Sequence, residues 1–151
     1  MKLFTIGYER TGLQGLVATL EDAGVKMLID VRELPNSRRA GFSKKTLASS
    51  LAEHDIAYVH LRALGTPKEG RIANRKHQWP LFWEIVETAL ATPAADEAFD
   101  DAAKLARRAP SCLLCLEADH TICHRLRVAQ RMAERYGFDV EHLHVEVTSM
   151  V

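Results

Sequence analysis

SCLLCLEADHTICHRLRVAQRMAERYG, the stretch from Ser111 to Gly137, predicts a strand, a loop and a helix in succession. The apolar run SCLLCLE has the length of a buried strand. After the polar loop, apolar side chains recur at helical spacing, and Gly137 is a natural helix end. These apolar positions are Leu126, Ala129, Met132, Ala133 and Tyr136. A strand that leads into a helix in this way is typical of α/β proteins with a parallel sheet.

The same alternation extends along the whole chain. Short apolar runs at residues 3–8, 26–31, 56–64, 111–117 and 140–147 predict five strands. Amphipathic runs lie between them and predict helices on both faces of the sheet. We therefore expect a single α/β domain over the full 151 residues, built as a three-layer sandwich with a mostly parallel sheet of about five strands.

Composition excludes several classes of protein. The hydrophobic fraction of 47% is enough for a core without disulfides. No apolar run approaches the roughly eighteen residues of a membrane span, and the first residues do not resemble a signal peptide. Three cysteines, an odd number, argue against a disulfide framework and favour free thiols. We expect a cytoplasmic protein that does not associate with membranes.

Charge is unevenly distributed, although the net charge is zero. Residues 32–77 contain ten Lys and Arg against four acids, a balance of +6, and the rest of the chain balances it at −6. A basic segment of this kind indicates an anionic partner. The alternative is that these charged side chains only keep surface loops solvated. Within it, the polar stretch 65–79 contains two glycines and a proline and is predicted to be a functional loop.

Each predicted strand carries polar or titratable side chains toward its carboxyl end or just after it. In parallel sheets, ligands bind at the carboxyl ends of the strands, so these side chains are the first candidates for a site. They are Tyr8, Glu9, Arg10, Asp30, Arg32, His60, Arg62, Cys115, Glu117, His142 and His144.

Four stretches together resemble a known family. They are TIGYE at residues 5–9, DVRELPNSRRAGFSKKTL at 30–47, YVHLRALGTPKEGR at 58–71 and LLCLEADHTICHRLRVA at 113–129. In this order they resemble the domain of unknown function 488 family of bacteria and archaea. The resemblance implies an α/β domain, no established activity, and a set of candidate residues: Tyr8, Asp30, Arg32, Pro35, Ser37, Arg38, Phe42, His60, Gly65, Cys115, Glu117, Cys123, His124 and Arg125.

Cys123, His124 and Arg125 stand where the last helix is expected to begin. A helix N-terminus attracts anions, and an arginine there adds donors suited to phosphate or carboxylate. The same setting lowers the pKa of a thiol, so Cys123 could be a nucleophile, or it could simply fill the cap position. Together with the basic loop after the second strand, the predicted anion-binding residues are Arg32, Arg38, Ser37, His124 and Arg125.

The cysteines also raise the question of a metal. Cys112 is expected in the core. Cys115 and Cys123 are separated by seven residues, unlike the short spacings of structural zinc sites, and no second cysteine pair exists. A mixed site with His120, His124, His60 or His144 stays open, as does a redox pair. The sequence therefore predicts no metal and no cofactor.

Glu117 is the leading acid–base candidate, because a carboxyl group at a strand end beside thiols can have a raised pKa. A structural role is slightly favoured, in which Glu117 orients Arg125 or caps the following loop. Asp30 and Arg32 are expected to point to opposite faces of their strand, so that Asp30 must find another partner. A structural role for Asp30 is favoured over a catalytic one. The predicted catalytic residues are Cys123, Glu117, His60 and Asp30.

These observations favour an enzyme that acts on a phosphate-bearing small molecule or nucleotide at the carboxyl ends of the strands. A nucleic-acid-binding module that uses the basic segment 32–77 is the first alternative. A metal- or thiol-based sensor is the second. The sequence leaves the reaction type and a homodimer open.

Overall fold

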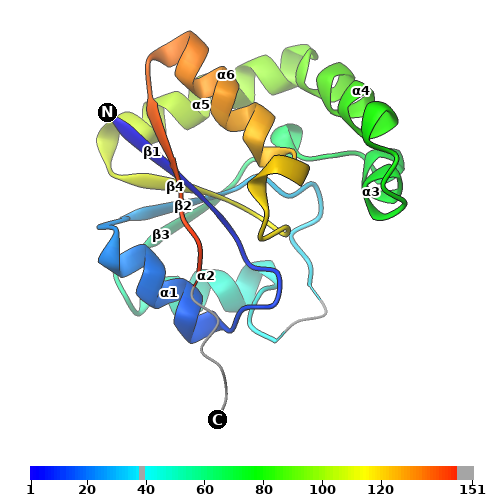
Figure 1. Cartoon of the computed structure of the whole chain (residues 1–151). Helices are drawn as coiled ribbons and strands as arrows, with labels where there is room; N and C mark the ends of the chain where they lie inside the picture. Colours follow the sequence, from blue (N-terminus) through cyan, green and yellow to red (C-terminus); the bar gives the residue numbers. More distant parts are fainter. Residues whose placement is uncertain (38–39, 146–151) are drawn as a thin grey trace.

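The computed structural model describes residues 1–37 and 40–145, so the predicted anion ligand Arg38 lies outside the described residues. Five parallel strands form one sheet in the order β3-β2-β4-β1-β5 (Figure 1). The strands are β1 (Lys2–Gly7), β2 (Met27–Asp30), β3 (Ala57–His60), β4 (Ser111–Cys115) and β5 (Asp139–His142). The predicted α/β class and parallel sheet are confirmed.

In the described part of the chain, six helices cover the two faces of the sheet (Figure 1). One face carries α1 (Leu13–Asp22) and α2 (Lys44–Ala52). The other carries α3 (Lys68–Arg75), α4 (Trp79–Leu90), α5 (Pro93–Arg108) and α6 (Arg125–Tyr136). Two short 3-10 helices, η1 (Arg62–Leu64) and η2 (His120–Ile122), precede α3 and α6. Among the described residues, no helix is long and apolar enough to cross a membrane.

The central strand β4 organises the core because it lies between β1 and β2. All five of its residues are buried. Side chains alternate between the faces of a strand. Accordingly, Leu113 and Cys115 pack in the core beneath α4, α5 and α6, whereas Cys112 and Leu114 pack in the core beneath α1 and α2. The prediction that Cys112 is a core residue is confirmed.

Two predicted elements differ from the structure. The stretch 65–79, predicted as a loop, contains α3. Its buried residues are the small Gly70 and Ala73, so the helix has no stripe of large apolar side chains to reveal it. The fifth strand, predicted over residues 140–147, ends at His142, and residues 146–151 lie outside the described part of the chain.

Candidate functional site

A cavity of about 550 Å³ lies at the carboxyl ends of β1, β2 and β4. We call it the carboxyl-end cavity. Segments that are distant in sequence come together around it, because these three strands are neighbours in the sheet. The residues that line it are Tyr8, Arg32, Glu33, Leu34, Asn36, Ser37, Thr66, Arg71, Asn74, Arg75, Phe82, Cys115, Leu116, Glu117 and His124.

Asp30 and Arg32 form a buried ion pair beneath this cavity. Arg32 Nη2 lies 2.7 Å from Asp30 Oδ2, and the side chains are 5% and 0% exposed. Arg32 also donates from Nε to both carboxylate oxygens, and Tyr58 donates its hydroxyl to Oδ2. The expectation that Asp30 and Arg32 would not pair is wrong, because residues two apart share one face of a strand.

The guanidinium of Arg32 is almost fully engaged by the protein. Besides Asp30, its Nη1 donates to the Phe42 carbonyl and to the Tyr8 hydroxyl. Burial alone would lower the pKa of Arg32, but the bonds to Asp30 and the nearby charge raise it above its usual value. Arg32 thus lines the cavity as a fixed cation rather than as a mobile anion clamp, and it ties the segments after β1 and β2 together.

His60 lies to one side of the cavity and is not among its lining residues. One of its ring nitrogens, Nε2, is 2.7 Å from the carbonyl oxygen of Arg32. A carbonyl only accepts, so Nε2 carries the proton of this hydrogen bond. His60 therefore helps to hold the backbone of Arg32, and its acid–base role stays a prediction.

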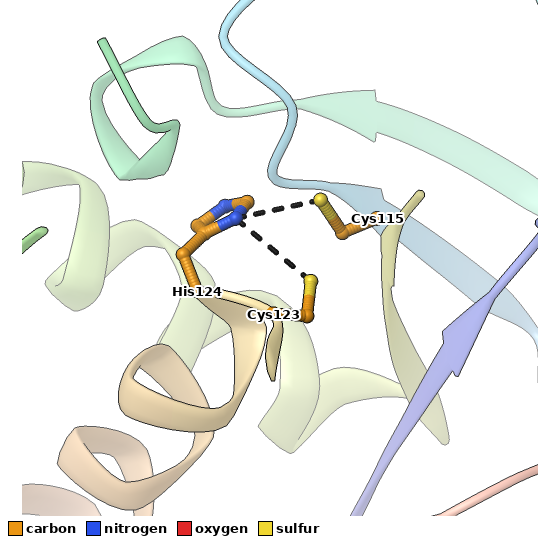
Figure 2. Close-up of side chains that lie close together, drawn as sticks. All are labelled: Cys115, Cys123 and His124. Carbon is orange, nitrogen blue, oxygen red and sulfur yellow. Dashed lines mark hydrogen bonds between the residues drawn. The ribbon is translucent and has the colours of Figure 1, made fainter. Parts of the chain in front are cut away.

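Cys115, Cys123 and His124 converge beside the cavity. The three donor atoms, two sulfurs and one ring nitrogen, all lie within 4.8 Å of one another. Figure 2 shows both sulfur atoms turned toward Nδ1 of His124, at 3.4 Å from Cys115 Sγ and 4.0 Å from Cys123 Sγ. Cys123 is still in an extended conformation, and His124 is the first residue with helical dihedrals, so the start of α6 brings both toward the end of β4.

Hydrogen bonding fixes which nitrogen of His124 faces the thiols. His124 Nε2 lies 2.8 Å from the carbonyl oxygen of Val31, which can only accept. Nε2 must therefore carry a proton, and in the neutral ring Nδ1 offers a lone pair to the two sulfurs. Burial opposes a charge on His124, but the hydrogen bond and charge interaction with Cys123 together with the Val31 bond raise its pKa.

Glu117 reaches the same cluster from the segment after β4. Its Oε2 accepts from the Cys115 thiol at 3.9 Å, and both residues line the cavity. Burial, together with the neighbouring Cys123, raises the pKa of Glu117 to about 8. At neutral pH the carboxyl group is mostly protonated, so it can donate as well as accept.

Cys123 is fully buried and does not line the cavity. Burial raises the pKa of its thiol to about 12, with the Cys115 thiol adding to the effect. This is the opposite of the lowered pKa that a helix N-terminus can give to a cysteine. The nucleophile role of Cys123 stays a prediction, and the burial of its sulfur argues against it.

Arg125 is also fully buried, and its donors are used inside the protein. Nε donates to Thr5 Oγ1, Nη1 to the Glu117 carbonyl and Nη2 to the Ala118 carbonyl. The side chain is not among those that line the cavity. Arg125 therefore fixes the segment 117–118 against β1, and its predicted anion contact stays a prediction.

Two arginines that sequence reasoning did not single out line the cavity. Arg71 and Arg75 are one turn apart on α3. Arg71 Nη1 donates to Glu33 at 2.7 Å and to the Thr66 carbonyl at 2.8 Å. Arg75 is exposed, and no residue among 1–37 and 40–145 pairs with it. Their spacing of four would have revealed a shared helix face if α3 had been predicted. Of the predicted anion ligands, Arg32, Ser37 and His124 line the cavity as well.

The comparisons with known proteins give one result. The family model of the domain of unknown function DUF488 matches residues 12–132, which includes Cys115, Cys123 and His124. None of the curated proteins and none of the solved structures that were compared matches this chain. The match covers well over half of the 151 residues. The chain therefore belongs to the family of the domain of unknown function DUF488.

Proposed function

We propose that this protein is an enzyme that acts on a phosphate-bearing small molecule or nucleotide in the carboxyl-end cavity. The observation that carries the proposal is the pair Arg71 and Arg75, which line the same cavity as Cys115 and Glu117. Cations and titratable groups thus line one cavity, as expected for a site that binds an anionic substrate and catalyses its reaction.

Charge at the cavity supports an anionic ligand. Of the described residues that line it, three arginines face two carboxylic acids, Glu33 and Glu117. Arg32 is neutralised from below by Asp30, and Arg71 pairs with Glu33 through one nitrogen. Arg75 has no such partner among the described residues. A phosphate group that bound between Arg71 and Arg75 would receive charge-assisted hydrogen bonds from both.

A buried hydroxyl adds to this support. Thr66 lines the cavity, and its Oγ1 has no hydrogen-bond partner among residues 1–37 and 40–145. A buried polar atom without a partner costs free energy, so such atoms commonly mark a place that a ligand or water completes. The three free thiols also fit the cytoplasmic location that we propose.

The residues divide into binding and reacting groups. Arg71 and Arg75 would hold the phosphate, while Arg32 adds a fixed positive charge beneath it. Glu117 lies at the cavity surface beside Cys115, which places its carboxyl group within reach of a bound molecule. We therefore assign Glu117 as the acid–base group because its side chain lines the cavity.

The test is calorimetric titration of the protein with inorganic phosphate and with nucleoside monophosphates. Removing an arginine that bonds to a charged group costs about 1.5–3 kcal/mol. The variants Arg71→Gln and Arg75→Gln should therefore each weaken binding by about tenfold to a hundredfold. Arg108→Gln is the matched control, because Arg108 is exposed at the end of α5, just before β4 begins, and so lies at the amino-terminal ends of the strands, away from the cavity.

Two outcomes would contradict the proposal. One is equal affinity of the wild type and the Arg71→Gln, Arg75→Gln double variant. The other is binding only to polynucleotides, with an affinity that falls steeply as salt rises, which would favour the nucleic-acid-binding module.

A further inference from the structure

Beyond anion binding, we propose that Cys115, Cys123 and His124 form a site for one zinc-like divalent metal ion, with its fourth position open toward the carboxyl-end cavity. The proposal does not depend on a phosphate ligand. It rests on the convergence of two sulfurs and one imidazole nitrogen from β4 and the start of α6 (Figure 2).

The distances suit a tetrahedral ion. Bonds of about 2.3 Å to sulfur and about 2.0–2.1 Å to nitrogen give a sulfur-to-nitrogen edge of about 3.6 Å and a sulfur-to-sulfur edge of about 3.8 Å. The observed sulfur-to-nitrogen distances of 3.4 and 4.0 Å lie on either side of the first value. All three atoms lie within 4.8 Å of one another, so shifts below about 1 Å would complete the geometry.

Hydrogen bonding holds the cluster only through long contacts of 3.4–4.0 Å. Nδ1 of His124 has one lone pair, yet the thiols of Cys115 and Cys123 both lie against it, and the other acceptor of Cys115, Glu117 Oε2, is as far as 3.9 Å away. His124 Nε2 cannot help, because its hydrogen is given to the Val31 carbonyl. A metal ion that replaced the two thiol protons would instead bond all three atoms at once.

The bond to Val31 is also what a metal-binding histidine requires. Ligating histidines usually donate their second ring N–H to a carbonyl or carboxylate, which fixes the ring and presents the other nitrogen to the metal. Here the donor is Nε2 and the presented atom is Nδ1. Because the partner is the backbone carbonyl of the residue directly after β2, the ring is oriented by backbone that the sheet holds in place.

Charge balance suits the burial of the site. Cys123 is 0% exposed, Cys115 6% and His124 5%, so an uncompensated ion would be costly there. Two thiolates neutralise a divalent ion, and the imidazole adds no charge. Soft sulfur ligands with one imidazole favour zinc or cobalt over magnesium or calcium.

The fourth coordination position of the ion would face the carboxyl-end cavity. Cys115 and His124 line the cavity, whereas Cys123 lies behind them. Three protein ligands and one open position are typical of catalytic zinc, while structural zinc has four protein ligands. Glu117 lies beside the open side, 3.9 Å from Cys115 Sγ. The open position would admit water or a substrate atom from the cavity.

Cobalt(II) titration of the full chain tests the site directly. The protein is used reduced, free of any tag, and in buffer without phosphate or chelator, so that failure here does not bear on phosphate binding. We expect one cobalt per chain, visible absorption typical of tetrahedral coordination, and a near-ultraviolet sulfur-to-cobalt band that zinc abolishes.

Variants identify the ligands. Loss of a residue that only hydrogen-bonds to a metal ligand weakens metal binding by roughly 10–100-fold. Cys115→Ala and Cys123→Ala each remove a ligand itself, so each should weaken cobalt binding by more than this. Each should also halve the sulfur-to-cobalt band. Cys112→Ala is the matched control, since Cys112 is a buried cysteine on the opposite face of β4. It should retain wild-type affinity and absorption.

A second measurement needs no substitution, in case the Cys123 variant does not fold. Zinc should slow the alkylation of Cys115 in the native wild-type protein by at least tenfold. The inference is overturned if the reduced wild type takes up no cobalt, if a folded Cys115→Ala variant keeps the full wild-type band and affinity, or if zinc leaves the alkylation rate of Cys115 unchanged.

Discussion

Asp30→Asn is the substitution for which the structure gives the clearest expected magnitude. Asp30 is fully buried and accepts from the Nε, the Nη2 and the backbone N–H of Arg32, as well as from the Tyr58 hydroxyl. Asparagine keeps the shape but removes the charge, and its amide group places hydrogens against these donors. The guanidinium of Arg32, only 5% exposed, would then be buried without a counter-ion.

Breaking a buried ion pair in this way costs about 3–5 kcal/mol. With a urea dependence of about 2 kcal/mol per molar, the unfolding midpoint should fall by about 2 M. The assay is urea unfolding followed by far-ultraviolet circular dichroism and tryptophan fluorescence. Asp96→Asn is the control, because the Asp96–Arg135 pair is exposed and its loss should cost less than about 1 kcal/mol. An Asp30→Asn variant within 1 kcal/mol of the wild type would refute this structural role.

Two further substitutions test the surroundings of the site. In Gly7→Ala the added Cβ would lie 1.8 Å from the carbonyl oxygen of Glu117, so we expect a loss of at least about 3 kcal/mol in urea unfolding, whereas Gly12→Ala, with open space around it, should stay within about 1 kcal/mol. Burial, His120, Arg125 and His144 lower the pKa of His142 to about 4. In the unfolded chain the pKa of His142 is about 6.5, so the unfolded state binds more protons than the folded state between pH 4 and pH 6.5. The contribution of neutral His142 to stability is therefore fully present above pH 6.5 and is lost as the pH falls toward 4. After allowance for partial exposure of the ring, the wild type should lose about 1 kcal/mol more than His142→Gln between pH 7.5 and pH 5, and equal losses would contradict the assignment.

The alternation of strands and helices could be predicted because each strand-to-helix unit carries its own local signals. The run at residues 111–117 was apolar and short, and α6 showed helical spacing up to Gly137, which adopts the left-handed conformation expected of a helix end. The helix α3 could not be predicted in the same way. Its buried side is made of Gly70 and Ala73, whose small side chains leave no apolar periodicity.

The site could be predicted only in part, because local sequence does not specify which loops meet. Cys115, Glu117 and His124 were identified as candidates from strand and helix ends, and they do line one cavity. Which of four histidines would join Cys115 and Cys123 depends on the turn from η2 into α6. The Asp30–Arg32 pair, in contrast, could have been predicted from the sequence, since residues two apart in an extended segment point to the same side.

The most direct test of the account is a crystal structure of the wild-type protein grown with a saturating nucleoside monophosphate. We predict electron density for the phosphate inside the carboxyl-end cavity, within hydrogen-bonding distance of the guanidinium groups of Arg71 and Arg75, and with the rest of the ligand directed toward Cys115 and Glu117. A cavity that contains only solvent while the nucleotide binds elsewhere on the surface would contradict the proposed function.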